Sequence, residues 1–229
     1  MRVISPWFEI LFLPPGPEVL ALIERAGRTC YKSEHLISHD SAAEFVRRIV
    51  ASGHHSVIEH ASATVRFVCD RGVSHELVRH RLAAYSQEST RYANYSQERF
   101  GNQITVIRPM FWEEGSAEHQ AWRRAMEQAE AAYLGLLELG AKPQEARAVL
   151  PNSLKTEVVM TANLREWRHV LNLRCSKPAH PQIRQLMLPL LSEFSRRIPV
   201  FFDDLAQQYA GEILRFAAGP AALSPPPAD

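Results

Sequence analysis

Apolar residues recur along this chain with two periods, and each period predicts one kind of secondary structure. Alternation of apolar and polar residues is typical of half-buried strands. In residues 62–70 it places Val65, Phe67 and Cys69 on one side of a predicted strand. Short runs that are rich in β-branched residues or closed by proline predict further strands at residues 2–13, 104–107 and 153–162.

Apolar residues at helical spacing predict the helices. The longest pattern runs from Ser116 to Gly140, and the others cover residues 17–28, 41–50, 74–80, 143–149, 163–173 and 181–198. Ser41 with Glu44 forms a capping-box pattern, and Asn163 is expected to cap the helix that follows it.

Strands mixed with long helices, without a repeat or a linker, predict the α+β class. We expect a single mixed domain over residues 1–218, in which a twisted, largely antiparallel sheet packs against long helices. The remaining residues 219–229, GPAALSPPPAD, are proline-rich and are expected to be disordered.

The composition allows a normal hydrophobic core but gives no overall charge for an ionic partner. The chain has 229 residues, of which 46% are hydrophobic, and its 26 basic and 25 acidic side chains leave a net charge of +1. Binding to nucleic acid or to a membrane through a broad basic surface is therefore not expected. Only four of the basic residues are lysines, so 22 are arginines, and an anion site must come from local clusters of them.

The cysteines and the N-terminus favour a cytoplasmic protein. Cys30, Cys69 and Cys175 are odd in number, far apart and without a CxxC pair, which fits a reducing compartment. The apolar N-terminus is interrupted by prolines and too short for a signal or spanning helix. We therefore expect a soluble, cytoplasmic protein.

The stretch from Arg79 to Arg91, RHRLAAYSQESTR, carries the strongest sign of chemistry. It combines three arginines with a histidine, two serines, a threonine, a glutamine and a glutamate. Guanidinium groups hold a phosphate from several sides, and hydroxyl groups fill the remaining positions. A solvated helix face is the alternative, but the apolar residues 82–85 interrupt it and glutamate is scarce, so we favour an anion site.

Residues 53–60, GHHSVIEH, gather polar side chains between a predicted helix and a predicted strand. Metal binding is one interpretation, since His55 and Glu59 lie four residues apart. The order of a zinc-binding helix motif is absent, however, and no further ligands follow at metal spacing, so we predict no metal site. We favour a loop in which Ser56 touches a ligand while Glu59 and His60 form internal hydrogen bonds.

Three other places allow a structural and a functional interpretation. Glu76 lies three residues before Arg79 and either forms an ion pair within a helix or borders a ligand. Arg147, at a predicted helix end, either complements the helix dipole or reaches an anion. A later helix puts Arg165 and His169 on one face, which is either an ordinary charged face or a binding surface.

Several familiar catalytic motifs are missing from the sequence. There is no GxxxxGK[ST], GxGxxG or GxSxG pattern, so none of the folds with those fingerprints is indicated. Cys175 beside Arg174 could be a nucleophile, because a neighbouring cation favours the thiolate. We favour a structural thiol.

The same residues resemble a known family. Arg79-His80-Arg81, followed after seven residues by Ser89, is similar to the RHR-x7-S signature of the flavin-dependent thymidylate synthases. The segments GHHSVIEH, SQESTRY, ARAVLP and ANLREWRHVLNLR agree in order and spacing, so the resemblance spans about residues 52–205. It implies reductive methylation of dUMP to dTMP, with 5,10-methylenetetrahydrofolate as carbon donor, FAD as redox carrier and NADPH as reductant. It also implies a homotetramer whose subunits share active sites.

The resemblance further implies roles for individual residues. The implied FAD contacts are Ser56, Arg79, His80, Arg81, Gln87, Asn163, Arg165 and His169. The implied dUMP contacts are Glu76, Leu77, Val78, Arg79, Gln87, Glu88, Ser89, Thr90, Arg91, Arg147 and Arg174. Arg174 is also the implied catalytic residue: its guanidinium would stabilise negative charge on the uracil ring, so that C5 becomes nucleophilic without a cysteine. Ser89 has no base of known geometry beside it, and we assign it to binding.

Two alternatives from other functional classes remain. An arginine-rich RNA- or nucleotide-binding module would need a broad basic face with exposed aromatic residues. The near-neutral net charge and the nearby Glu88 and Glu98 count against it. A flavoprotein that has lost methyl transfer is the second alternative, and the presence of both Arg147 and Arg174 counts against that one.

Overall fold

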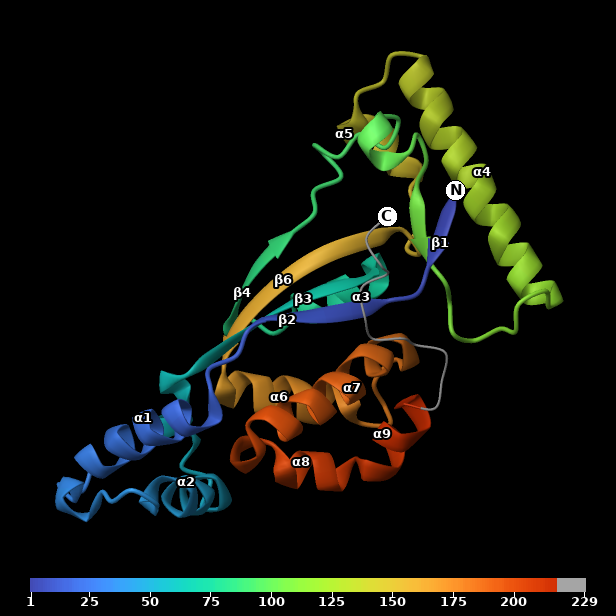
Figure 1. Cartoon of the computed structure of the whole chain (residues 1–229). Helices are drawn as coiled ribbons and strands as arrows, with labels where there is room; N and C mark the ends of the chain where they lie inside the picture. Colours follow the sequence, from blue (N-terminus) through green and yellow to red (C-terminus); the bar gives the residue numbers. More distant parts are fainter. Residues whose placement is uncertain (218–229) are drawn as a thin grey trace.

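An antiparallel sheet in the strand order β2-β3-β6-β4 organises the fold (Figure 1). Its strands are β2 (Trp7–Phe12), β3 (Ser62–Asp70), β6 (Lys155–Asn163) and β4 (Ala83–Gln87). The central strands β3 and β6 pair over their full length, and all three neighbouring pairs are antiparallel, as predicted. The computed structural model describes residues 1–217, so the prediction for residues 219–229 lies outside the described residues.

Helices cover one face of this sheet and extend past its ends (Figure 1). α6 (Leu164–Cys175) and α7 (Pro181–Arg197) lie below the sheet in this view, followed by α8 (Asp203–Gln208) and α9 (Ala210–Ala217). The others are α1 (Gly16–Thr29), α2 (Ser41–Ala51), α3 (Arg71–Leu77), α4 (Ala117–Glu138) and α5 (Pro143–Ala146). The predicted mixed α+β class is confirmed. None of these described helices has the length and apolar character of a membrane span.

Strand alternation gives the sheet one apolar face and one polar face. Val65 and Phe67 of β3 and Val158 and Met160 of β6 are fully buried, and they pack in one core with Trp167 of α6. The opposite face carries charged, partly exposed side chains, among them Arg66 of β3 and Glu157 of β6. The apolar face therefore stabilises the fold, while the polar face is free for other contacts.

A second, smaller core lies at the far end of the molecule. β1 (Arg2–Ile4) and β5 (Thr105–Ile107) form a parallel two-stranded sheet. Its buried residues Ile104 and Val106 belong to a cluster with Trp122 and Tyr133 of the long helix α4. This unit holds the segment between β4 and α4 against the main sheet.

The sequence predicted side-chain caps at two helix starts, and one of these two caps is formed. Oδ1 of Asn163 accepts from the backbone N of Glu166 at 2.8 Å, which confirms Asn163 as the cap of α6. The capping box at Ser41 is wrong, because α2 begins at Ser41 itself. The Ser41 hydroxyl instead donates to Oε2 of Glu24 at 2.9 Å and so ties α2 to α1.

Three other predictions require correction. The strand over residues 2–13 is two strands, β1 and β2, which join different sheets on either side of Pro6, a residue without a backbone donor. The helix predicted over residues 74–80 is α3, which begins earlier, at Arg71, and ends at Leu77. The earlier start follows from Asp70, which caps the helix by accepting a hydrogen bond from the backbone N of Val73. β4, α8 and α9 were not predicted; β4 reads AAYSQ and lacks the β-branched residues that mark strands.

Candidate active site

Arg174 lies at the centre of the candidate site, because all three guanidinium nitrogens are bonded to other predicted site residues. It is half-buried in the last turn of α6. Its Nε donates to Nε2 of His80 at 3.0 Å, and its Nη1 donates to Oε2 of Glu76 at 2.6 Å. Its Nη2 donates to the backbone oxygen of Glu76 at 3.1 Å. The interpretation that Glu76 pairs with Arg79 within a helix is therefore wrong, and we call Arg174, Glu76 and His80 the closed cluster.

His80 is buried and neutral at physiological pH. Burial, followed by the charges of Arg174 and His169, lowers the pKa of His80 to about 4. Since Nε2 accepts from Arg174, the single proton of the neutral ring is on Nδ1. Nδ1 lies 3.8 Å from Oε1 of the buried Glu166, and the ring of His169 stands edge-on at a centroid distance of 5.7 Å. His80 thus orients the guanidinium without adding a second positive charge.

Tyr85 on β4 holds the turn that carries the closed cluster, and no sequence pattern singled it out. Its hydroxyl lies 2.6 Å from the backbone oxygen of Leu77 and 2.9 Å from that of His80. Burial, with the nearby charge of Glu166, raises the pKa of Tyr85 to about 12, so the phenol remains a donor. Tyr85 reaches this turn because it pairs with Met160 in the sheet. This strand pairing is the information that the sequence pattern did not provide.

Gln87 and Glu88, adjacent in the sequence, point to different partners. Nε2 of Gln87 donates to Oγ of Ser74 at 3.0 Å and to Oγ1 of Thr156 at 3.2 Å. Oε2 of Glu88 accepts from Nζ of Lys155 at 3.0 Å. Both predicted contact residues are therefore already engaged within the chain, and a ligand would share or replace these bonds.

The predicted nucleotide loop after Glu88 and Arg147 form an open group. Nη1 of Arg147 donates to Oγ1 of the buried Thr90 at 3.3 Å. The backbone oxygen of Ser89 accepts from the backbone N of Ala93 at 2.9 Å, which closes a turn. The side chains of Arg91 and Arg147 are exposed. We call Ser89, Thr90, Arg91 and Arg147 the open loop.

Ser56 and Arg165 lie together at a third place. Both line a cavity of about 360 Å³ between the end of α1, the 3-10 helix His55–His60 and the start of α6. Nη1 of Arg165 donates to Oε1 of Glu59 at 2.6 Å, which confirms the internal bond expected of Glu59. Within the described residues the exposed His60 forms no such bond, so that part of the prediction is wrong.

The residues of the RHR turn differ in exposure. Arg79 and Arg81 are exposed, and among residues 1–217 neither guanidinium has a hydrogen-bond or ion-pair partner. Val78 is 40% exposed, whereas the side chain of Leu77 is fully buried in the core. Leu77 can therefore face a ligand only through its backbone, and Tyr85 already occupies its carbonyl oxygen.

The structure brings the predicted residues into three groups rather than one. In the first group, Arg174 is hydrogen-bonded to both Glu76 and His80. In the second, Arg147 is hydrogen-bonded to Thr90, and in the third, Ser56 and Arg165 line the same cavity. Within the described part of the chain, no hydrogen bond or ion pair joins one group to another. A complete site therefore needs either a ligand or a further subunit to unite them.

The rival chemistries receive no support from the geometry. Cys175 is fully buried, and burial raises its pKa to about 12, so the structural interpretation of this thiol holds. Nε2 of His55 bonds to the backbone oxygen of Val50 at 3.1 Å, and Glu59 is paired with Arg165. In residues 1–217 no three His, Cys, Asp or Glu side chains are grouped as metal ligands would be.

The fold and these groups define a class: an α+β protein that presents several exposed arginines beside a half-buried one. The Thy1 family model, described as "Thymidylate synthase complementing protein", matches residues 15–200. A flavin-dependent thymidylate synthase of Geobacter sulfurreducens is 35% identical over 204 residues, which cover 86% of each chain. Its namesake in Pyrococcus furiosus is 32% identical over 178 residues, 77% of this chain and 72% of the relative. The chain therefore belongs to the Thy1 family of flavin-dependent thymidylate synthases.

A solved structure shares the fold. The UMP/dUMP methylase PolB from Streptomyces cacaoi, bound with 5-Br dUMP, matches with a TM-score of 0.74. The match covers 89% of this chain and 96% of the other at 24% sequence identity. At that identity the likeness speaks for the architecture alone.

Proposed function

We propose that this enzyme methylates dUMP to dTMP reductively, with 5,10-methylenetetrahydrofolate as carbon donor, FAD as redox carrier and NADPH as reductant. The observation that carries the proposal is the half-buried guanidinium of Arg174, which is held by the three hydrogen bonds that it donates to Glu76 and His80. A cation fixed in this way stabilises developing negative charge without first having to reorganise. Residues 1–218 would form the catalytic domain.

The proposed task of Arg174 is to polarise the uracil ring. Its charge would stabilise electron density at N3 and O4, and C5 would become nucleophilic as a result. Burial raises the pKa of both Cys69 and Cys175, which opposes a thiolate at either position. The proposed route accordingly uses neither of these thiols.

The residues present fit the needs of FAD. Its diphosphate requires donors, and the cavity of about 360 Å³ beside Ser56 and Arg165 offers a hydroxyl and a guanidinium. The exposed Arg79 and Arg81 present two more guanidinium groups. Bound FAD would supply the hydride and mediate transfer of the methylene carbon. His80, Gln87, Asn163 and His169 complete the proposed contacts.

The open loop would hold the phosphate and sugar of dUMP. Three large apolar side chains near the closed cluster support a shared site in a homotetramer: Val78 is 40% exposed, Leu82 76% and Leu173 46%. A contiguous exposed patch of large apolar residues, as these would form, is typical of a contact between subunits. The open loop of one subunit would then face the closed cluster of another.

The reaction is tested with purified protein. We expect it to be yellow, to lose flavin absorbance on anaerobic addition of NADPH, and to form dTMP from dUMP and methylenetetrahydrofolate. The alternative of a binding module predicts a colourless protein. A preparation that takes up no FAD and binds no dUMP would overturn the proposal.

The shared site is tested by mixing two variants at a dUMP concentration that does not saturate Arg91→Ala, so that Arg174→Ala is impaired in the chemical step and Arg91→Ala in dUMP affinity. If Arg174 and Arg91 serve one site from different subunits, mixed tetramers of Arg174→Ala and Arg91→Ala contain some sites with both arginines. Activity of the mixture should then exceed that of either variant after subunit exchange. Activity that stays at the level of the separate variants would show that each site is built from one chain.

A further inference from the structure

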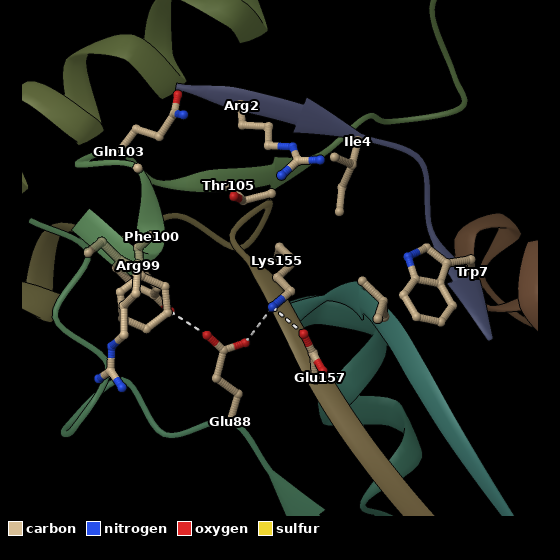
Figure 2. A pocket seen from close by; sticks show the side chains of 13 residues that line it. Arg2, Ile4, Trp7, Glu88, Arg99, Phe100, Gln103, Thr105, Lys155 and Glu157 are labelled. Atoms are coloured by element: carbon tan, nitrogen blue, oxygen red, sulfur yellow. Dashed lines mark hydrogen bonds and ion pairs between the residues drawn. The ribbon is translucent and has the colours of Figure 1, made fainter. Parts of the chain in front are cut away.

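A cavity outside the proposed catalytic groups lies between the small sheet and the polar face of the main sheet (Figure 2). Its volume is about 340 Å³, which is at the lower end of the range for small-molecule sites. β1 and β5 form one wall, and β2, β3 and β6 form the other. None of the contacts proposed for FAD lies in it, and Glu88 is the only proposed dUMP contact among its lining residues.

Both carboxylates of this cavity are paired with the same lysine. Nζ of Lys155 lies 3.0 Å from Oε2 of Glu88 and 2.7 Å from Oε1 of Glu157. The other oxygen of Glu88 accepts from the hydroxyl of Tyr95 at 3.2 Å. Figure 2 shows Glu88, Lys155 and Glu157 side by side in the cavity. Both carboxylates are therefore engaged in ion pairs within the chain.

The remaining charges of the cavity are positive. Arg2 and Arg99 also line it, and both are exposed. Within residues 1–217 neither guanidinium forms a hydrogen bond or an ion pair. Figure 2 shows the guanidinium of Arg2 directed toward Lys155. With Lys155 they give three cations against two carboxylates, so the cavity has an excess positive charge suited to a phosphate.

Aromatic rings form the sides of the cavity. Trp7 is at one end and Phe100 at the other in Figure 2, and both are partly exposed. The guanidinium of Arg66 lies over the ring of Trp7 at 5.1 Å, so a heterocycle would stack on the other face of this partly exposed indole. A volume of about 340 Å³ has room for one ring with a phosphate ester.

We propose that this cavity is a second ligand site, which binds a mononucleotide: a phosphate ester that carries a planar ring. Arg2 and Lys155 bind the phosphate, Arg99, whose guanidinium lies over the ring of Phe100 at 4.8 Å, adds positive charge at that end, and Trp7 stacks on the ring. The paired Glu88 and Glu157 keep Lys155 in the cavity. This ligand is separate from the dUMP of the proposed reaction, which the open loop would hold.

The proposal is tested by calorimetric titration of the full-length holoenzyme with AMP, adenosine and inorganic phosphate. We expect AMP to bind at least about tenfold more tightly than either fragment, because only AMP uses both the ring surface and the guanidinium groups. Arg2→Gln and Trp7→Ala should each weaken AMP binding about tenfold, which is about 1.4 kcal/mol. Thermal unfolding of each variant verifies that it is folded.

Arg91→Gln is the matched control, because it removes an exposed guanidinium from the open loop instead. It should weaken the binding of dUMP and leave the binding of AMP unchanged, whereas Arg2→Gln should weaken the binding of AMP and leave that of dUMP unchanged. Loss of AMP binding in Arg91→Gln would place AMP in the substrate site and overturn the proposal. Phosphate that binds as tightly as AMP, or AMP affinity unchanged in Arg2→Gln, would overturn it as well. The outcomes measured with AMP do not depend on whether dUMP is the substrate.

Discussion

Arg174 and Arg147 are both expected to touch the nucleotide, yet they have opposite surroundings. Arg174 is half-buried, and all three of its guanidinium nitrogens are bonded within the closed cluster. Arg147 is exposed and has one bond, of 3.3 Å, to Thr90. A side chain that folding has already ordered loses little further entropy when a ligand arrives, whereas a free one must be ordered by the ligand. We infer that the closed cluster serves the chemical step and the open loop serves capture of the substrate.

Arg174→Ala should have the largest effect on this division. We expect kcat to fall about 100- to 1,000-fold, roughly 2.7–4 kcal/mol, which is typical for loss of a fixed donor to a developing charge. FAD content should stay unchanged. Stopped-flow measurement of flavin oxidation, with dTMP analysed by chromatography, checks both. Arg174→Lys keeps the charge but not the fork that meets Glu76 and His80, and it should recover only part of the rate. Normal turnover in Arg174→Ala would refute the assignment.

Arg91→Ala tests the open loop. We expect dUMP binding to weaken by about 1.5–3 kcal/mol, the contribution of a hydrogen bond to a charged group, with kcat little changed. Equilibrium titration of dUMP separates affinity from turnover. Arg123→Ala is the control, since Arg123 is an exposed arginine of α4 paired with Glu127 on its own helix. A variant that binds dUMP as the native enzyme does would remove Arg91 from the phosphate site.

Elements with a local pattern were predictable from the sequence, and elements defined by pairing were not. α4 and β3 carry strong periodicity over long stretches, and both lie where it indicated. β4 reads AAYSQ, which has no strand period, and it is a strand only because β6 pairs with it. The split of residues 2–13 likewise depends on two distant partners, β5 and β3.

The same limit applies to the candidate site. The arginines and His80 are visible in the sequence because their residue types and spacing form a motif. Tyr85 and Glu166 are not, since a tyrosine in an apolar run and a glutamate in a helix read as ordinary structure. Their positions beside His80 follow from strand pairing and from the packing of α6, which no local pattern encodes.

The neutral His80 predicts a pH dependence of stability. The folded pKa is about 4, below the ordinary value of 6.5, so between these values the unfolded chain binds a proton that the folded chain does not. Stability should therefore fall as the pH drops from 6.5 toward 4, by at most about 1.4 kcal/mol per pH unit for this group. Denaturant unfolding at a series of pH values measures it. His80→Gln keeps an acceptor for Arg174 but does not titrate. Its unfolding free energy should therefore change less steeply with pH, by the contribution of one proton. An equal slope in both proteins would mean that His80 is protonated in the fold.

Tyr85→Phe should have the smallest effect and gives the sharpest test of the division between closed cluster and open loop. The change keeps the ring and removes only the hydroxyl that lies near the backbone oxygens of Leu77 and His80. We expect unfolding free energy to fall by about 0.5–1.5 kcal/mol, the net contribution of one hydrogen bond. Because the turn orients His80 and through it Arg174, kcat should fall severalfold while dUMP affinity stays the same. Tyr92→Phe is the control, since the ring of Tyr92 is exposed, and it should change neither the unfolding free energy nor kcat. If Tyr85→Phe weakened dUMP binding and left kcat intact, the turn would serve substrate binding. The inferred assignment of the closed cluster to the chemical step and of the open loop to substrate binding would then be wrong.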